Sequence, residues 1–277
     1  PRILSSAASD VYKRQKPIID NSDPVAALAF RFFFVAVGFL LFSLYSKYSI
    51  IIKRKNLIES VLSGILFHGL YLGGVFYSIS IGMPTSIAAL IVTLQPILTN
   101  ILSGPILNEK VTLKQWIGVL LGFLGATLVL GLDLGSKIPL LGLVATLIAL
   151  ISITASTIWQ KKLSNNLPLS VSNFYQAIGG CFFHILVVIF FAKPYIAFTK
   201  TFLLSMGHQI FLVSFGAFTI LMFLIKKNSA SKTVSIFFLI PATSALMAWF
   251  FLKESLTAID LLGFLITSIG VYIATRD

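Results

Sequence analysis

The stretch LQPILTNILSGPILNEKVTLKQWIGVLLGFLGATLVL at residues 94–130 has a counterpart, LIPATSALMAWFFLKESLTAIDLLGFLITSIGVYIAT, at residues 239–275. Adding 145 to a residue number carries Pro96 onto Pro241 and Glu109 onto Glu254. The same shift superposes a threonine and two glycines of each stretch: Thr112 on Thr257, Gly118 on Gly263 and Gly125 on Gly270. Because Pro, Glu and Gly match in one register, the sequence predicts an internal repeat.

Both stretches lie in an unusually apolar chain. Its 277 residues are 57% hydrophobic and 11% charged, and its mean hydropathy is +0.96. Soluble domains carry about 25% charged residues, and a helix needs about 20 mostly apolar residues to cross a bilayer. Nine segments meet this length, at residues 24–46, 58–81, 84–107, 113–131, 139–160, 169–192, 205–226, 233–252 and 257–275. The predicted fold class is an all-α, polytopic membrane bundle.

The repeat sets the number and direction of the helices. Residues 136–277 contain five apolar segments and residues 16–135 contain four, so a tenth helix is expected where the chain begins. The polar stretch PRILSSAASDVYKRQ at 1–15 is interpreted as a non-native or disordered scar, with a native polar tail as the alternative. A five-helix unit crosses the membrane an odd number of times, so the second copy is predicted to be inverted, as in secondary transporters.

The positive charges predict the orientation. On one side of the predicted bundle lie twelve cationic residues: Lys47, Lys53, Arg54, Lys55, Lys110, Lys114, Lys161, Lys162, Lys226, Lys227, Lys232 and Arg276. The other side carries five from residue 16 on: Lys16, Lys137, Lys193, Lys200 and Lys253. The positive-inside rule makes the richer side, with the C-terminus, cytoplasmic. The net charge of +12 is thereby explained without a nucleic-acid partner.

Four stretches carry a family resemblance: DPVAALAFRFFFVAVGFLL at 23–41, GMPTSIAALIVTLQPILTNIL at 82–102, LNEKVTLKQWIGVLLGFLGATLVL at 107–130 and TVSIFFLIPATSALMAWFFLKESLTAIDLLGFLITSIGVYIA at 233–274. They resemble the EamA family of the drug/metabolite transporter superfamily. The resemblance covers residues 16–277, with the first helix missing. It implies ten helices in two inverted five-helix repeats, export of small metabolites or amino acids, and a bacterial inner membrane as the location.

Polar residues inside membrane helices are candidates for a substrate cavity. The residues singled out are His68, Tyr71, Gln95, Thr99, Trp159, Asn173, Gln176, His184 and Arg31. Packing between helices is the alternative, because Ser, Thr and Gln also bond across helix interfaces. A cavity role is favoured for His68, Gln95 and Gln176. No Asp or Glu lies near the middle of a predicted helix, so His68 and His184 are the residues there that could titrate near neutral pH.

Arg31 has two interpretations. It lies about two turns into the first predicted helix, where a charge needs a partner or water. Its guanidinium could bind an anionic substrate group such as a carboxylate. Alternatively, it reaches the outer headgroups or bonds a carbonyl.

The paired residues of the repeat predict hinges, caps and packing faces. Pro96 and Pro241 remove a helix hydrogen bond and are interpreted as hinges, with a static kink as the alternative. Glu109 and Glu254 are predicted to cap the helix that follows each of them, with proton coupling as a weaker alternative. Helix packing, within the fold or in a homodimer, is predicted for two small-residue faces: Gly118, Gly122, Gly125, Gly263, Thr267 and Gly270.

The predicted function is secondary transport of a small molecule by alternating access. A membrane binding or assembly protein without transport is the alternative. No enzyme activity, metal or cofactor is predicted, because His68, His184 and His208 lack a metal-ligand spacing and no paired acids occur. The predicted partners are a small-molecule substrate and membrane lipid.

Overall fold

A computed structural model describes residue 18 and residues 21–131, 138–164, 166–191, 194–252 and 257–276. These residues form α2 (Pro24–Tyr45), α3 (Arg54–Gly64), η1 (Ile65–Tyr71), α4 (Leu72–Ser80), α5 (Thr85–Val92), α6 (Gln95–Leu107), α7 (Leu113–Leu130), α8 (Leu140–Ser164), α9 (Leu169–Phe191), α10 (Lys200–His208), η2 (Gln209–Ala217), α11 (Phe218–Lys227), α12 (Ala230–Ser235), η3 (Ile236–Phe238), α13 (Leu239–Leu252) and α14 (Ala258–Thr275). The segment 1–15 and Glu254 lie outside the described residues, and so do the predictions made for them.

The apolar segments predicted from the sequence agree with most of the long helices of the structure. Within the described part of the chain, eight helical segments are long and apolar enough to cross a membrane. They coincide with eight of the nine predicted segments, although two begin earlier, at Arg54 and Lys200. The remaining segment, 233–252, is divided into α12, η3 and α13. The chain is a multi-pass membrane protein.

The distribution of side chains fits a lipid environment. On α2, Phe33, Leu41 and Phe42 are 55–61% exposed, whereas Ser43 on the same helix is buried. Exposed apolar surface on this scale is rare in soluble monomers, and polar groups inside a bilayer protein turn away from lipid.

The 145-residue shift relates the helices almost residue by residue. It carries α7 (Leu113–Leu130) onto 258–275, which are the bounds of α14, and α2 (Pro24–Tyr45) onto 169–190, within α9. The caps correspond as well. Thr112 and Gln115 form a capping box before α7, and Thr257 and Asp260 form one before α14. The internal repeat predicted from Pro, Glu and Gly is therefore present in the helices themselves.

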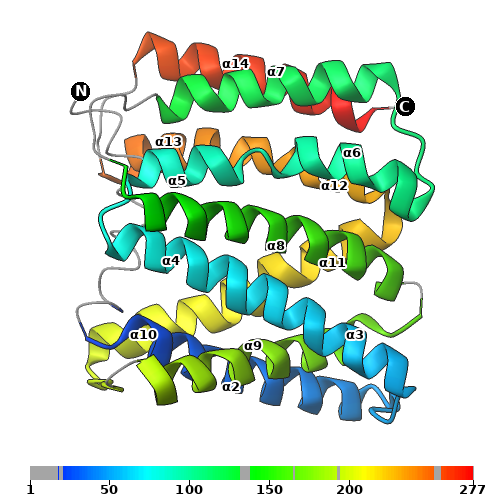
Figure 1. Ribbon diagram of the computed structural model, residues 1–277, viewed down its shortest axis with the longest axis vertical. Coiled ribbons are helices and arrows are strands. Elements are labelled where there is room, and N and C mark those ends of the chain that lie inside the picture. Colours follow the sequence, from blue (N-terminus) through cyan, green and yellow to red (C-terminus); the bar gives the residue numbers. More distant parts are fainter. Residues whose placement is uncertain are drawn as a thin grey trace. The chain divides into compact units, whose positions relative to one another are not determined.

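The chain forms two compact units, and neither is a sequence half. Unit 1 contains Tyr77–Thr154 and Ser229–Asp277, and unit 2 contains Arg14–Phe76 and Ala155–Asn228. Each unit thus combines helices from both repeats. In unit 1 the equivalent helices α7 and α14 pack on each other, and in unit 2 the equivalent helices α2 and α9 do so (Figure 1).

The α7–α14 pair shows that the repeats are inverted. A Cβ on Gly118 would lie 2.6 Å from the Gly270 oxygen, and one on Gly125 would lie 2.6 Å from the Gly263 oxygen. The early part of α7 therefore faces the late part of α14, so the helices are antiparallel. The shift also turns each contact into the other, since 125 becomes 270 and 263 becomes 118. This self-complementary contact is the signature of a two-fold relation between inverted copies.

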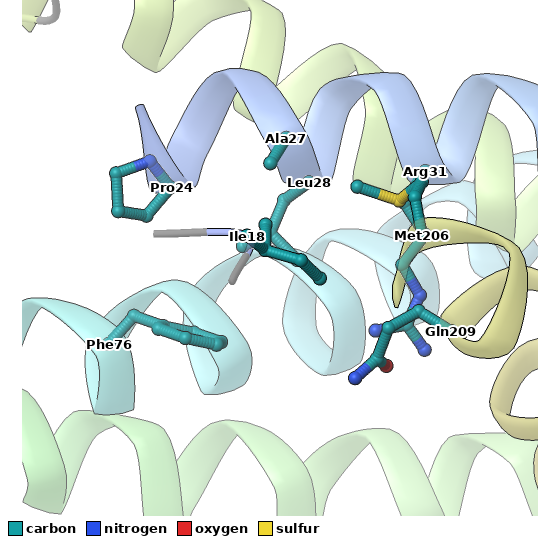
Figure 2. Close-up of a pocket in the computed structure, with 8 residues that line it drawn as sticks. All are labelled: Ile18, Pro24, Ala27, Leu28, Arg31, Phe76, Met206 and Gln209. Carbon is teal, nitrogen blue, oxygen red and sulfur yellow. The ribbon is translucent and has the colours of Figure 1, made fainter. Parts of the chain in front are cut away.

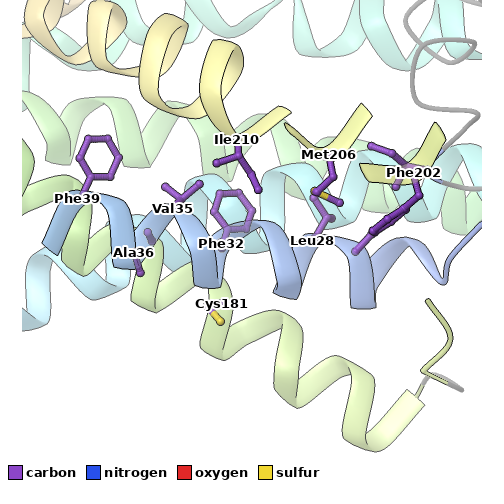
Figure 3. Packing of buried hydrophobic residues seen from close by; sticks show 12 residues of the cluster. Leu28, Phe32, Val35, Ala36, Phe39, Cys181, Phe202, Met206 and Ile210 are labelled. Carbon is purple, nitrogen blue, oxygen red and sulfur yellow. The ribbon is translucent and has the colours of Figure 1, made fainter. Parts of the chain in front are cut away.

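Unit 2 repeats this arrangement with α2 and α9. Ser43 donates to Ser170 across 2.8 Å, and the Cys181 thiol lies 3.5 Å from the Ala29 oxygen, so these helices are antiparallel too. Their apolar faces and α10 enclose a cluster that includes Phe32, Val35, Phe39, Cys181, Phe202, Met206 and Ile210 (Figure 3). This cluster positions the third turn of α2, where Arg31 lies.

Irregular turns occur at repeat-equivalent places. The π-helices are η1 (Ile65–Tyr71) and η2 (Gln209–Ala217), and the shift carries 65–71 onto 210–216. Neither π-helix was predicted from the sequence. π-Helical turns are rare and frequently lie at functional sites.

The two prolines interrupt their helices, as expected. α5 ends at Val92 and α6 begins at Gln95, one residue before Pro96. Pro241 is the third residue of α13 and follows the 3₁₀ turn η3. Because proline has no N–H and clashes with the carbonyl four residues earlier, the regular helix can resume only at or near each proline. Their role as hinges stays a prediction.

Candidate functional site

Arg31 is held inside unit 2 by a hydroxyl and an aromatic ring. Asp23 caps α2 by accepting a hydrogen bond from the Ala26 nitrogen at 2.8 Å, and Arg31 follows about two turns later. Its Nε donates to the Ser214 hydroxyl at 3.0 Å, and its Cζ lies 5.3 Å from the centre of the Phe32 ring. Ser214 is only 3% exposed and belongs to η2, so the guanidinium is anchored to an interior group.

Two histidines continue this cluster. The Phe32 ring centre lies 4.4 Å from that of His68 and 5.9 Å from that of His184, with which it is stacked. His184 Nε2 is 2.9 Å from the His68 carbonyl oxygen, whereas its Nδ1 is buried without a hydrogen-bond partner among the described residues. Arg31, His68 and His184, from three parts of the chain, are therefore brought together.

The π-helix η1 meets α9 through a glycine. A Cβ on Gly180 would lie 2.6 Å from the Cβ of His68, so α9 can approach η1 this closely only without a side chain at 180. Tyr71 ends η1, and its ring lies 5.6 Å from that of Phe67, which in turn lies 5.1 Å from the His68 ring. Tyr71 thus lies at the edge of the same cluster.

A cavity of about 30 Å³ adjoins Arg31. Figure 2 shows its walls, which come from α2, α4 and the α10–η2 junction: Ile18, Pro24, Ala27, Leu28, Arg31, Phe76, Met206 and Gln209. Arg31 and Gln209 are its polar walls, and Phe76 and Met206 are among the apolar ones. This volume holds roughly two water molecules, or a group as small as a carboxylate.

Gln176 lies in a polar chain between helices. Gln160 Nε2 donates to the side-chain oxygen Oε1 of Gln176 at 3.0 Å, and Gln176 Nε2 donates to the Ser172 hydroxyl at 3.0 Å. Gln160 also donates to Ser156, which bonds Ser63 at 2.9 Å. Such bonds are typical of packed membrane helices. A cavity role for Gln176 stays a prediction, and its observed bonds are those of packing.

The remaining predicted cavity residues differ in their burial and in their hydrogen bonding. Asn173 is buried, and neither atom of its amide has a partner among the described residues. Trp159 is half-buried in α8. Gln95 and Thr99 are buried in α6 and belong to unit 1. None of these placements decides whether the residue lines a cavity.

Glu109 caps a helix, but not the one predicted. Its carboxylate accepts hydrogen bonds from the Ala230 nitrogen at 2.8 Å and the Ser231 nitrogen at 3.3 Å. These are the first residues of α12, in the other repeat. The prediction that Glu109 caps the next helix, α7, is wrong because Thr112 and Gln115 already satisfy that terminus.

The six small residues predicted to pack lie face to face within unit 1. A Cβ on Gly270 would lie 2.4 Å from the Gly122 nitrogen, and one on Gly125 would lie 2.4 Å from the Thr267 hydroxyl oxygen. These contacts join α7 to α14 within one chain. The homodimer alternative for this face is not needed to explain it.

Sequence reasoning missed Ser214 and Gln209. They are five residues apart, and α-helical periodicity does not place such residues on one face. Both lie in η2, where hydrogen bonds of the π type change that periodicity. A polar residue at each end of the apolar run Ile210–Val213 was the available signal.

The cluster around Arg31 contains a positive charge and, among the described residues, no carboxylate that pairs with it. The Nη atoms of Arg31 have no hydrogen-bond partner in the described part of the chain. Nor do the described residues contain a group of three His, Cys, Asp or Glu side chains suited to a metal ion. The site therefore offers a cation, an amide and aromatic surface.

Two inverted repeats with interrupted helices and buried polar groups define the architecture of a secondary transporter. The family model "EamA-like transporter family" matches residues 4–131 and 140–276, one match for each repeat. The chain belongs to the EamA-like transporter family, and its drug/metabolite-type transporter character is thereby established.

Several curated proteins are similar to it. The uncharacterized transporter YvbV of Bacillus subtilis is 29% identical over 221 residues, which cover 76% of this chain and 68% of that protein. A probable amino-acid metabolite efflux pump of Escherichia coli is 24% identical over 217 residues, covering 72% and 70%. A solved crystal structure superposes with a TM-score of 0.80 at 14% identity, covering 98% of this chain and 94% of that one. The last similarity concerns the fold alone.

Proposed function

We propose that this chain is a secondary transporter that exports an amino acid or small metabolite by alternating access. The observation that carries the proposal is the self-complementary contact of α7 with α14, in which Gly118 meets Gly270 and Gly125 meets Gly263. Two inverted copies can exchange conformations, so that a site between them opens to each side in turn. The E. coli relative named as a probable amino-acid metabolite efflux pump supports the substrate class.

The proposed function implies a membrane location and an orientation. The chain lies in a plasma membrane, most simply a bacterial inner membrane, with its C-terminus in the cytoplasm. The excess of Lys and Arg on the side of Arg276 supports this orientation. Its partners are the transported solute and lipid, with no nucleic acid, and it catalyses no chemical reaction.

Flux measurements test the proposal. The purified protein is reconstituted in liposomes loaded with a panel of unlabelled amino acids, and exchange for the labelled compound is measured. Saturable exchange of at least one compound, absent from protein-free liposomes, is expected. Folded, monodisperse protein that exchanges none of a broad panel of amino acids and metabolites would contradict the function.

A further inference from the structure

Arg31 carries a positive charge that the described protein does not neutralise. Its Nε is used by Ser214 at 3.0 Å, and no described carboxylate pairs with it. A charge within a membrane helix is costly unless water, a partner or a ligand compensates it. The two terminal nitrogens of the guanidinium are therefore the groups that await an acceptor.

The side chain is directed inward. Ser214 is 3% exposed, and Phe32, over whose ring the guanidinium lies, is 1% exposed. A side chain that reached for the lipid headgroups would not bond an interior hydroxyl of η2. These contacts argue against a side chain that reaches the outer headgroups, and they use only the Nε of the guanidinium.

The cavity beside Arg31 matches a small anionic group. The Gln209 amide also lines it and has no hydrogen-bond partner among the described residues. A guanidinium donates two parallel hydrogen bonds to a carboxylate, and an amide can donate to an oxygen or accept from an ammonium group. The apolar walls, such as Leu28 and Met206, suit a carbon skeleton (Figure 2).

From these contacts we infer that Arg31 binds the carboxylate of the transported solute and that Ser214 positions the guanidinium for it. This inference rests on the proposed transport function and narrows its substrates to carboxylate-bearing compounds. The cavity of about 30 Å³ accommodates the carboxylate and not a whole amino acid. The rest of the solute then needs the helices α2, α4 and α10 to separate further.

The test compares amino acids with their carboxamides. Leucine and phenylalanine are paired with leucinamide and phenylalaninamide, and each pair is measured by exchange flux and by thermal stabilisation of the purified protein. The variants are Arg31→Gln, Arg31→Lys and Ser214→Ala, and Arg54→Gln is the matched control. Arg54 begins α3, is exposed, and lies outside the cavity, so its substitution makes the same change in charge elsewhere.

The wild type and Arg54→Gln are expected to prefer the carboxylates. In Arg31→Gln that preference falls roughly ten- to a hundredfold, as for loss of a charged hydrogen-bonding partner. Arg31→Lys keeps part of the preference because it keeps the charge, and Ser214→Ala loses part of it. If Arg31→Gln does not fold, Arg31→Lys and Ser214→Ala test the carboxylate site. An unchanged preference for carboxylates in both variants overturns the inference.

Failure of the inference and failure of the proposed function look different. Flux without a preference for carboxylates, or a preference that survives Arg31→Gln, overturns the inference and leaves transport standing. Absence of flux contradicts transport, and equal thermal stabilisation by acid and amide then overturns the carboxylate site as well. Liposomes with and without phosphatidylglycerol distinguish two possible ligands of Arg31, an anionic lipid headgroup and the carboxylate of the solute. An effect of Arg31→Gln that appears only with this lipid assigns the site to a headgroup and overturns binding of the solute.

Discussion

The close contact of α7 with α14 predicts that Gly118→Ala destabilises the protein, although alanine is the better helix former. A Cβ at 118 would lie 2.4 Å from the Ala274 nitrogen and 2.6 Å from the Gly270 oxygen. Both are backbone atoms, so a rotamer change cannot relieve the overlap. The helices must separate, and overpacking of this kind costs about 1–3 kcal/mol.

Gly207→Ala is the matched control. Gly207 lies in α10, and nothing lies within 4 Å of a Cβ placed there. The substitution should therefore stabilise the protein by about 0.5–1 kcal/mol, the usual gain from replacing glycine by alanine within a helix. Because the helix-propensity gain is common to both variants, they are expected to differ by the overpacking cost alone, about 1–3 kcal/mol.

Reversible unfolding of the purified protein in mixed micelles, with increasing denaturing detergent, measures both free energies of unfolding. A lower unfolding midpoint for Gly118→Ala and an unchanged or higher one for Gly207→Ala are expected. Equal stability of the two variants would refute the reasoning, because it would mean that α7 and α14 do not approach through this glycine.

Three further predictions concern caps and orientation. Glu109→Gln should lower the free energy of unfolding by about 1 kcal/mol, because the carboxylate at the N-terminus of α12 loses its charge; Lys110→Gln is the control, and an equal effect of the two in denaturation would argue against the cap. Thr112→Ala and Thr257→Ala should each cost about 0.5–2 kcal/mol in the same assay, since each removes half of a capping box; no loss in either would show that these boxes do not stabilise their helices. Alkaline phosphatase fused after Arg276 should be inactive in a bacterial host, because the C-terminus is expected in the cytoplasm; an active fusion would reverse the proposed orientation.

Local sequence was sufficient to predict a structural feature where the chemistry of a residue restricts the backbone around it. Pro96 was expected to interrupt its helix because it has no N–H to donate, and it does so, although Pro105 lies inside α6 without interrupting it. The capping boxes of Thr112 and Thr257 are equally local, but they were not predicted, because the caps were assigned to Glu109 and Glu254. The lengths of the apolar runs gave the membrane helices, since every helix must cross the same thickness of hydrocarbon. The repeat then supplied the inversion, because five crossings reverse the direction of the chain.

Only the tertiary structure decided which groups meet. Glu109 was predicted to cap α7 and instead caps α12, 121 residues away in sequence. Arg31 and Ser214 are separated by 183 residues, and nothing local to either residue indicates the other. In a membrane protein the helix surface is apolar toward lipid and toward neighbouring helices alike, so hydropathy cannot tell which face packs on which partner. The sequence therefore determined the helices and their symmetry. The packing of α2 against η2 and of α6 against α12 decided where these groups come together, because each contact joins an element of one repeat to an element of the other.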